Sequence, residues 1–163
     1  MPIYMKAGDV KGEVTAEGYA EQVELTSFQL GAGIGVSSPT GSGGKRTHSA
    51  ASFSELSATK AFDNASGLIF GKLAAGVAIP EVEITFVRAS GKDTAGNDKY
   101  LTVTLKDVLF SGWSVSSGGE MPSESISLNY GQIKLDYWKS DKDSVLTQGT
   151  IAGWDLATNK AAA

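Results

Sequence analysis

The chain has 163 residues, carries a formal net charge of −4 and contains no cysteine. Its length suits one domain with a single core. The mildly acidic balance gives no electrostatic basis for binding nucleic acid, and the lack of cysteine excludes disulfides, thiolate nucleophiles and cysteine metal sites. There is no run of 18 apolar residues and no apolar signal-peptide core, so we expect no membrane insertion and synthesis in the cytoplasm without a signal peptide.

The first part of the chain predicts strands over residues 3–7 and 19–30, followed by a glycine- and serine-rich segment over 31–48. This segment resembles two nucleotide-binding motifs and matches neither. Pro39 and Arg46 stand where a P-loop needs its first glycine and its final Ser or Thr, and Val36 replaces the third glycine of a dinucleotide fingerprint. A loop of this length without structure of its own tends to be functional, and we expect it to project from the body.

After a weaker strand signal over 48–60, the pattern changes to helical spacing over about 64–76. Leu68, Ile69 and Leu73 recur at this spacing, and Gly76 provides a stop signal. The candidate N-caps before this segment are Asp63, Asn64 and Ser66.

The second half of the chain returns to strand periodicity. Residues 78–88 and 100–110 alternate between apolar and polar side chains and flank the turn-rich segment 90–99, which predicts a long hairpin. Over 123–138 the apolar phase shifts by one residue at Gly131-Gln132, which predicts a β-bulge in a bending strand, with Tyr130 and Tyr137 both facing the core. A last strand follows near the C-terminus.

These patterns predict a mainly β fold: a compact antiparallel β-barrel with one short lateral α-helix and a long extended loop. No repeat or linker divides the chain, so we expect a single domain over 1–163, with the loop at about 31–48 and the helix at about 64–76.

No catalytic or metal-binding constellation emerges from the spacing. His48 is the only histidine, and a loop that begins at Asp141 lacks the glycine and glutamate of an EF-hand at Leu146 and Ala152. Gly41-Ser42-Gly43 lacks the frame of a nucleophile elbow. We therefore predict that the protein is not an enzyme and has no cofactor, no catalytic residue and no metal site.

Several segments in order resemble the hemolysin-coregulated protein (Hcp) family, the inner-tube subunit of the bacterial type VI secretion system. The likeness covers nearly the whole chain. It is carried by residues 4–13 (YMKAGDVKGE), 19–31 (YAEQVELTSFQLG), 56–66 (LSATKAFDNAS), 100–120 (YLTVTLKDVLFSGWSVSSGGE), 124–137 (ESISLNYGQIKLDY) and 153–155 (GWD).

The resemblance implies a β-barrel subunit that forms hexameric rings, which stack into a tube propelled by a contractile sheath. The implied partners are the chain itself as a stacked homohexamer, a spike protein at the tube tip, the sheath and small effector proteins in the lumen. The implied destination is the exterior, reached through the type VI system. The resemblance places the ring and stacking interface in the extended loop, at Gly35, Pro39, Gly41, Gly43, Lys45, Arg46 and His48. The resemblance together with strand alternation suggests that Gln22, Glu24 and Gln29 line the lumen.

Three alternatives stay open at this point. A phage-type tail-tube protein would use the same architecture. A monomeric β-barrel module would bind an apolar ligand or a sugar in a concave pocket. A hydrolase assembled from dispersed acids and His48 would lose its activity when His48 is replaced.

Overall fold

The computed structural model describes residues 1–39, 41, 44–89, 97–141 and 145–162. Strands dominate these residues, and one helix interrupts them, which confirms the predicted mainly β class. The elements are β1 (Ile3–Ala7), β2 (Val23–Leu25), β3 (Ser27–Gln29), β4 (Ala32–Gly33), β5 (Val36–Ser37), β6 (Thr47–His48), β7 (Ser52–Phe53), β8 (Leu56–Ala61), α1 (Asn64–Ala75), β9 (Ile79–Ala89), β10 (Asn97–Ser116), β11 (Ser123–Asn129), β12 (Gln132–Ser140), β13 (Leu146–Asp155) and β14 (Lys160–Ala161). No helix among them has the length and hydrophobicity needed to cross a bilayer.

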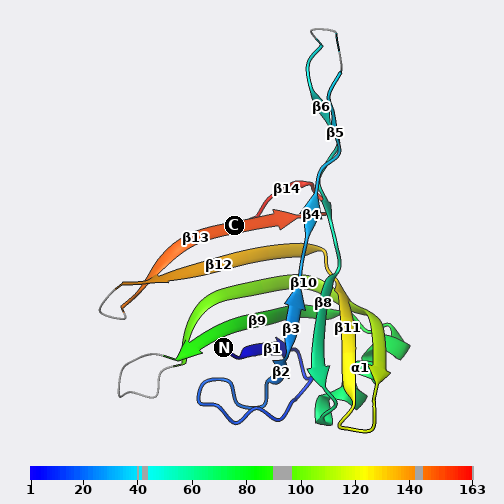
Figure 1. The fold of residues 1–163 in the computed structure, drawn as a ribbon, viewed down its shortest axis with the longest axis vertical. Helices are drawn as coiled ribbons and strands as arrows, with labels where there is room; N and C mark the ends of the chain where they lie inside the picture. Colours follow the sequence, from blue (N-terminus) through cyan, green and yellow to red (C-terminus); the bar gives the residue numbers. More distant parts are fainter. Residues whose placement is uncertain (40, 42–43, 90–96, 142–144, 163) are drawn as a thin grey trace.

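The strands form two layers that cross at a steep angle (Figure 1). The first half of β10 pairs with β9 and β12, and β13 continues that layer beyond β12. The second half of β10 pairs with β11, and β8 and β3 complete the other layer. The predicted β9–β10 hairpin is confirmed, while its connecting residues 90–96 lie outside the described residues.

The expected closed barrel is not formed. The hydrogen-bonded strand order ends at β14 on one side and at β3 on the other, and β1, β2 and β9 branch from this path. The two layers approach each other where the chain passes from β2, which pairs with β1, to β3, which pairs with β8. Only Thr26 separates these two strands. The result is a sandwich-like arrangement instead of one continuous barrel.

The phase change predicted as a bulge at Gly131-Gln132 has a different cause. β11 and β12 are two separate strands, and both pair with β10. The register of the pairing is the same on both sides of Gly131, since Lys106 lies opposite Gln132 and Leu109 lies opposite Asn129. In β10 the alternation of buried and exposed side chains also shifts by one residue, between Leu105 and Val108. Both strands therefore bend together, and no extra residue is inserted.

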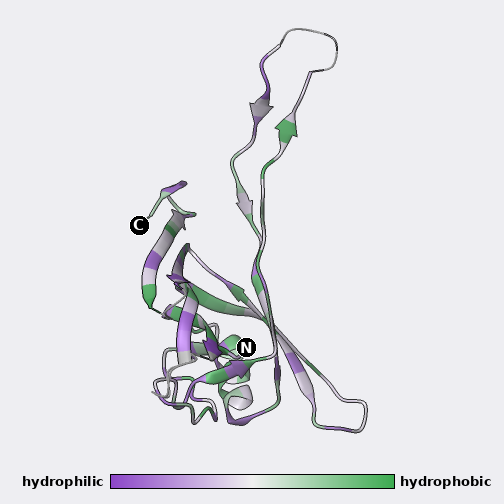
Figure 2. Ribbon diagram, turned by 60° about the vertical axis from the view of Figure 1, so that its left-hand side comes forward, coloured by the Kyte–Doolittle hydropathy of each residue, from purple (hydrophilic) through white to green (hydrophobic). Residues whose placement is uncertain are grey.

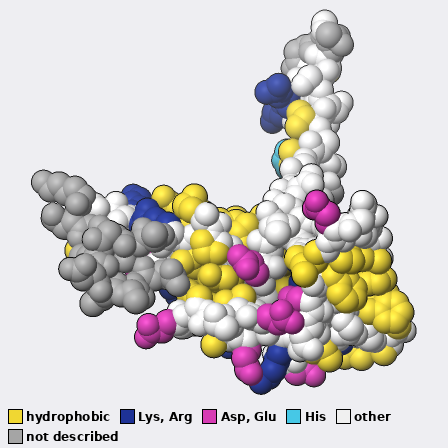
Figure 3. All heavy atoms as spheres, turned by 60° about the horizontal axis from the view of Figure 1, so that its bottom comes forward, with side chains coloured by type: hydrophobic (Ala, Val, Ile, Leu, Met, Phe, Trp, Pro, Cys, Tyr) yellow, Lys and Arg dark blue, Asp and Glu magenta, His cyan; other side chains and the backbone are white. Residues whose placement is uncertain are grey.

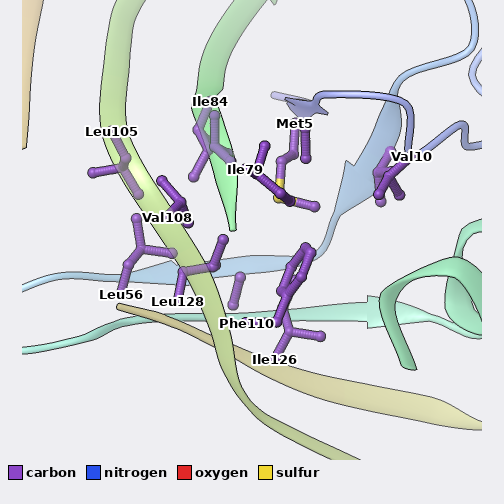
Figure 4. Close-up of a cluster of buried hydrophobic side chains, with 14 of the residues drawn as sticks. Met5, Val10, Leu56, Ile79, Ile84, Leu105, Val108, Phe110, Ile126 and Leu128 are labelled. Atoms are coloured by element: carbon purple, nitrogen blue, oxygen red, sulfur yellow. The ribbon is translucent and has the colours of Figure 1, made fainter. Parts of the chain in front are cut away.

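The core lies between the two layers. Figure 4 shows side chains from β1, β9 and β10 pointing toward side chains from β8 and β11, with Leu56, Ile84, Phe110 and Ile126 among them. Tyr130 is buried as predicted, whereas Tyr137 is 43% exposed, because β12 extends beyond the part of the sheet that the second layer covers. The prediction that Tyr137 belongs to the core is wrong.

The helix begins and ends where its capping residues predict. The Asp63 carboxylate accepts a hydrogen bond from the Ala65 amide, and the Ser66 hydroxyl accepts one from the Asp63 amide, which completes a capping box. Gly76 ends the helix with a φ of 63°, a left-handed conformation that glycine adopts without steric cost. The helix packs against β10.

The glycine-rich segment has secondary structure of its own, contrary to the expectation of an irregular loop. β4 pairs with β7, and β5 pairs with β6, so the described residues of 30–39 and 44–54 form a two-stranded ribbon. The ribbon continues the β3–β8 hairpin and projects far from the body (Figures 1 and 2). The projection itself was predicted, and the strand pairing within it was not.

Candidate assembly surfaces

The ribbon is held together by small residues. The Ser49 and Ser54 amides donate to the carbonyls of Gly35 and Gly31, at 2.9 and 2.8 Å. In return, the Ser49 and Ser54 hydroxyls accept from the amides of the same two glycines, at 3.0 and 2.9 Å. A Cβ at Gly35 would lie 3.1 Å from the Ser49 hydroxyl oxygen, so glycine is what lets each serine approach its partner's backbone.

The ribbon residues are almost all exposed, so the ribbon gains little from its own packing. Ile34 and Val36 are 50% and 56% exposed, and Lys45 and Arg46 lie beyond them toward the tip. Arg46 Nε donates to the Ser38 hydroxyl at 3.3 Å. An arm with exposed apolar and basic side chains has the character of a contact surface.

An apolar groove of about 330 Å³ opens at the base of the ribbon. One wall of the groove comes from the ribbon and the other from β12 and β13. The rings of Phe53 and Trp154 stack across the groove, with their centroids 6.5 Å apart. The lining residues are Leu30, Gly31, Ala32, Phe53, Ile133, Leu135, Ala152, Gly153 and Trp154. Sequence reasoning did not find this groove, since its residues come from four distant segments.

A second apolar surface lies beside α1. Phe70 is 51% exposed, and its ring centroid lies 5.2 Å from that of Trp113. Val115, two residues from Trp113 along β10, is 45% exposed. Figure 3 shows a broad hydrophobic area on the side of the molecule where α1 lies. The groove and this surface, which we call the α1 patch, come from different elements, so they are two distinct surfaces.

The outer face of the β3–β8–β11–β10 layer carries small uncharged side chains, and we call it the hydroxyl face. Its members share one face because they lie directly opposite each other in neighbouring strands. One row is Ser27, Thr59, Ser125 and Ser114; the next is Gln29, Ser57, Ser127 and Gly112. Ser27 and Thr59 hydroxyl oxygens lie 2.6 Å apart. The residues of these two rows are partly or fully exposed to solvent, and none of them is charged.

A buried ionic network lies beneath the hydroxyl face. The Lys60 ammonium is fully buried and donates to Asp63, Glu124 and the Ala61 carbonyl at 2.7–2.8 Å. Trp113 Nε1 donates to the second Glu124 oxygen at 3.0 Å. Burial of a charge is stable only with such compensation. The network ties β8, β11, β10 and the N-terminus of α1 together.

A hollow of about 320 Å³ lies at the end of the β3–β8 hairpin away from the ribbon. Its lining combines acidic and apolar residues: Glu13, Val14, Glu24, Thr26, Ala61, Phe62, Asp63 and Met121. Burial raises the pKa of the Tyr4 phenol, and the charge of the neighbouring Glu24 raises it further.

Comparison with known proteins identifies the family. Residues 4–137 match the family model described as "Type VI secretion system effector, Hcp". The chain is 30% identical over 162 residues to Protein hcp1 of Pseudomonas aeruginosa, a match that covers 96% of both chains. The chain belongs to the Hcp family of type VI secretion proteins. The resemblance inferred from the sequence is confirmed.

Solved structures of Hcp proteins share the fold. One reported as "Structure of a type six secretion system protein" matches with a TM-score of 0.88 and 25% identity over 99% of both chains. Hcp1 from Salmonella typhimurium matches with a TM-score of 0.77 and 21% identity over 99% of this chain and 98% of that one, which supports the fold alone.

Most of the assembly residues predicted for this Hcp protein lie on the ribbon. Gly35, Pro39, Gly41, Lys45, Arg46 and His48 are all exposed there, and Gly43 lies outside the described residues. Val36 pairs with His48 across the ribbon. The predicted lumen residues are not brought together: Gln29 belongs to the hydroxyl face, Glu24 lies in the hollow opposite Tyr4, and Gln22 is half-buried before β2.

The described part of this Hcp chain contains no group of three or more His, Cys, Asp or Glu side chains arranged to hold a metal ion. His48 Nδ1 contacts the Ser49 carbonyl oxygen on the exposed ribbon at 3.1 Å, away from the buried acids. The calcium-like loop after Asp141 includes residues 142–144, which lie outside the described residues.

Proposed function

We propose that this chain is the structural subunit of a type VI secretion tube. Six copies form a ring, and rings stack into a tube that a contractile sheath propels and a spike protein caps. Membership of the Hcp family supports this proposal. The single observation that carries it is the projecting ribbon with the apolar groove at its base, because so much uncovered binding surface on one small chain suits a self-assembling subunit.

The ring contact joins two different surfaces. A cyclic ring is heterologous: each copy offers one surface to the copy before it and another to the copy after it. The groove lined by Leu135 and Trp154 and the α1 patch around Phe70 are two such surfaces. Docking the patch of one copy against the groove of the next removes both from water.

The hydroxyl face lines the lumen. Its strands run in the same direction as the ribbon (Figure 1), so a ribbon that reaches along the tube axis places them along the channel. Rows of serine and threonine hold water and offer no fixed charge, which lets effector proteins of different charge travel without tight binding. Of the residues predicted for the lumen, Gln29 keeps that role.

The effector proteins carried in this lumen leave the cell with the tube. The subunit reaches the exterior through the type VI system. No catalytic role is assigned to the chain itself.

The mass of the particle in solution tests the proposal. Light scattering after size exclusion should give six times the 16.9 kDa chain mass. A monomer at high concentration would contradict the ring and favour a second candidate, a monomeric module that binds an apolar ligand in the groove of Leu30, Phe53 and Trp154. Quenching of tryptophan fluorescence by an apolar probe would then distinguish an occupied groove from an empty one.

A further inference from the structure

The β9–β10–β12 layer carries a polar basin on the side that faces away from the core. Its lining residues alternate along β9 and β10 with core residues such as Ile84 and Val103, which places them on the opposite face. The basin has a volume of about 430 Å³, and we call it the outer basin. Its charged members are three acids and three lysines, which balance one another: Glu81, Glu83, Asp136, Lys99, Lys106 and Lys134.

Two buried oxygen atoms in the lining of the outer basin have no partner. Thr102 and Asp136 lie directly opposite each other on β10 and β12, and they are only 4% and 8% exposed. The Thr102 hydroxyl and Asp136 Oδ1 have no hydrogen-bond partner among the described residues, whereas Asp136 Oδ2 lies 3.1 Å from Lys134 Nζ. Unpaired buried polar atoms cost free energy and are rare in native proteins, so this pair indicates a partner from outside the chain.

The charges of the outer basin select the kind of partner. A cation would meet the Lys134 ammonium beside Asp136 and two further lysines, which repel it. An anion would meet the Asp136 carboxylate itself and two glutamates. A neutral ligand with several hydroxyl groups avoids both penalties. One of its hydroxyls can donate to Asp136 Oδ1, and another can accept from or donate to the Thr102 hydroxyl.

An aromatic wall stands beside these two oxygens. Trp138 is two positions from Asp136 on β12, and both residues line the basin. Lys99 Nζ lies 4.5 Å from the centroid of the Trp138 ring. A flat apolar ring next to a polar floor matches a ligand that has C–H groups on one face and hydroxyl groups around its edge, and a pyranose has this form.

We propose that the outer basin binds one neutral sugar ring, with its hydroxyl groups on Thr102 and Asp136 Oδ1 and one ring face against Trp138. Because both oxygens are buried in the free chain, the sugar reaches them by displacing a side chain of the basin. Lys134 is suited to give way, since its side chain is 39% exposed and it pairs with the other carboxylate oxygen. The site does not depend on the proposed tube, because it shares no residue with the groove, the α1 patch or the hydroxyl face.

The position of Trp138 allows binding to be followed at the site itself. The chain has three tryptophans, so fluorine NMR of protein labelled with fluorotryptophan gives few signals, and Trp138→Phe assigns the one from the basin. The neutral probes are the methyl glycosides of glucose, galactose, mannose and N-acetylglucosamine. The charged probes are methylguanidinium chloride, inorganic phosphate and glycine.

At least one methyl glycoside should shift the Trp138 signal saturably at millimolar concentration and leave the Trp113 and Trp154 signals in place. Thr102→Val should weaken this affinity severalfold without lowering stability to urea, because the hydroxyl has no partner in the free chain. Thr85→Val is the matched control. Thr85 lies opposite Thr102 on β9 and is 2% exposed, but its hydroxyl donates to Glu83 Oε1 at 3.3 Å, so this variant should keep the affinity.

Three results would overturn the sugar site. The first is a Trp138 signal that none of the glycosides shifts saturably. The second is saturation by a charged probe alone, which would assign the basin to an ionic partner. The third is a Thr102→Val variant that binds the glycoside as tightly as the wild type, since the unpaired hydroxyl would then have no part in binding.

Discussion

Asp107 has a left-handed backbone, with a φ of 52°, and lies directly opposite Gly131. The Gly131 amide donates to the Lys106 carbonyl at 2.9 Å, and a Cβ added at Gly131 would lie 3.3 Å from the Asp107 Cβ. This is the point at which β10 bends from one layer into the other and its partner changes from β12 to β11. The pair therefore sets the crossing of the two layers.

Replacing Asp107 by valine should destabilise the fold at this bend. Aspartate tolerates the left-handed region better than a β-branched residue does, and the conformation costs about 1–2 kcal/mol for ordinary L-residues. We expect Asp107→Val to lower the free energy of unfolding by about that amount, as measured by urea denaturation at fixed protein concentration. Asp107→Asn is the matched control and should change little. Equal stability of the valine and asparagine variants would contradict the role assigned to the bend.

The sequence predicted the position of this bend and not its form. The phase change near Gly131 is visible in one strand, and a bulge in that strand is the simplest explanation. The matching change in β10 is also present, between Leu105 and Val108, but nothing local shows that the two changes face each other. Strand pairing is a long-range property, so it required the structure.

The Lys60 network should be one of the most sensitive sites for stability. Lys60→Met leaves Glu124 and Asp63 with an uncompensated buried charge, which costs about 3–5 kcal/mol when one partner of a buried pair is removed. Thermal and urea unfolding should both show this loss. The double variant Lys60→Met with Glu124→Gln should lose less than Lys60→Met alone, because it removes one of the orphaned charges.

An exposed ion pair provides the control for this prediction. Lys11 and Glu21 lie 2.7 Å apart, but both side chains are more than 60% exposed. Lys11→Met should therefore lower the free energy of unfolding by less than about 1 kcal/mol. If the Lys11 and Lys60 variants lost the same stability, burial would not be the cause.

Alkaline pH should weaken the fold through buried tyrosines. Burial raises the pKa of Tyr130 and Tyr19 above the ordinary value of 10.0, with the charges of Glu83, Tyr4 and Asp98 adding to the effect at Tyr19. The unfolded chain loses these protons first as the pH rises, so the free energy of unfolding is preserved below about pH 10 and decreases above it. Tyr130→Phe should reduce this decrease, as measured by urea unfolding across the alkaline range.

The same variant has a separate effect at neutral pH. The Tyr130 hydroxyl donates to the Ser54 carbonyl at 2.8 Å, which anchors the base of the ribbon to the body. Losing this bond should cost about 1 kcal/mol. An alkaline decrease as steep in Tyr130→Phe as in the wild type would show that this tyrosine does not contribute to it.

The assembly surfaces were only partly visible in the sequence. Glycine and serine content marked the ribbon, and Lys45 and Arg46 were identified on it, because these residues are contiguous. The groove was not predicted, since Phe53 and Trp154 are a hundred residues apart and meet only through the β4–β7 and β12–β13 pairings. The hollow was missed for the same reason.

The proposed ring contact makes a specific prediction for mixtures of variants. Leu135→Asp places a charge in the groove, and Phe70→Asp places one in the α1 patch, so each variant alone should lose the ring and run as a monomer. A mixture retains one intact groove, on the Phe70 variant, and one intact patch, on the Leu135 variant. Because a heterologous contact joins a groove to a patch, the mixture should form dimers that cannot grow further.

Light scattering of the separate and mixed variants distinguishes this arrangement from a symmetric one. If the groove met another groove, the Phe70 variant alone would still associate, and mixing would add nothing. If the patch met another patch, the Leu135 variant alone would associate. Only the groove-to-patch contact makes both variants monomeric and their mixture dimeric, so a dimer that appears on mixing identifies the two surfaces and their pairing in one measurement.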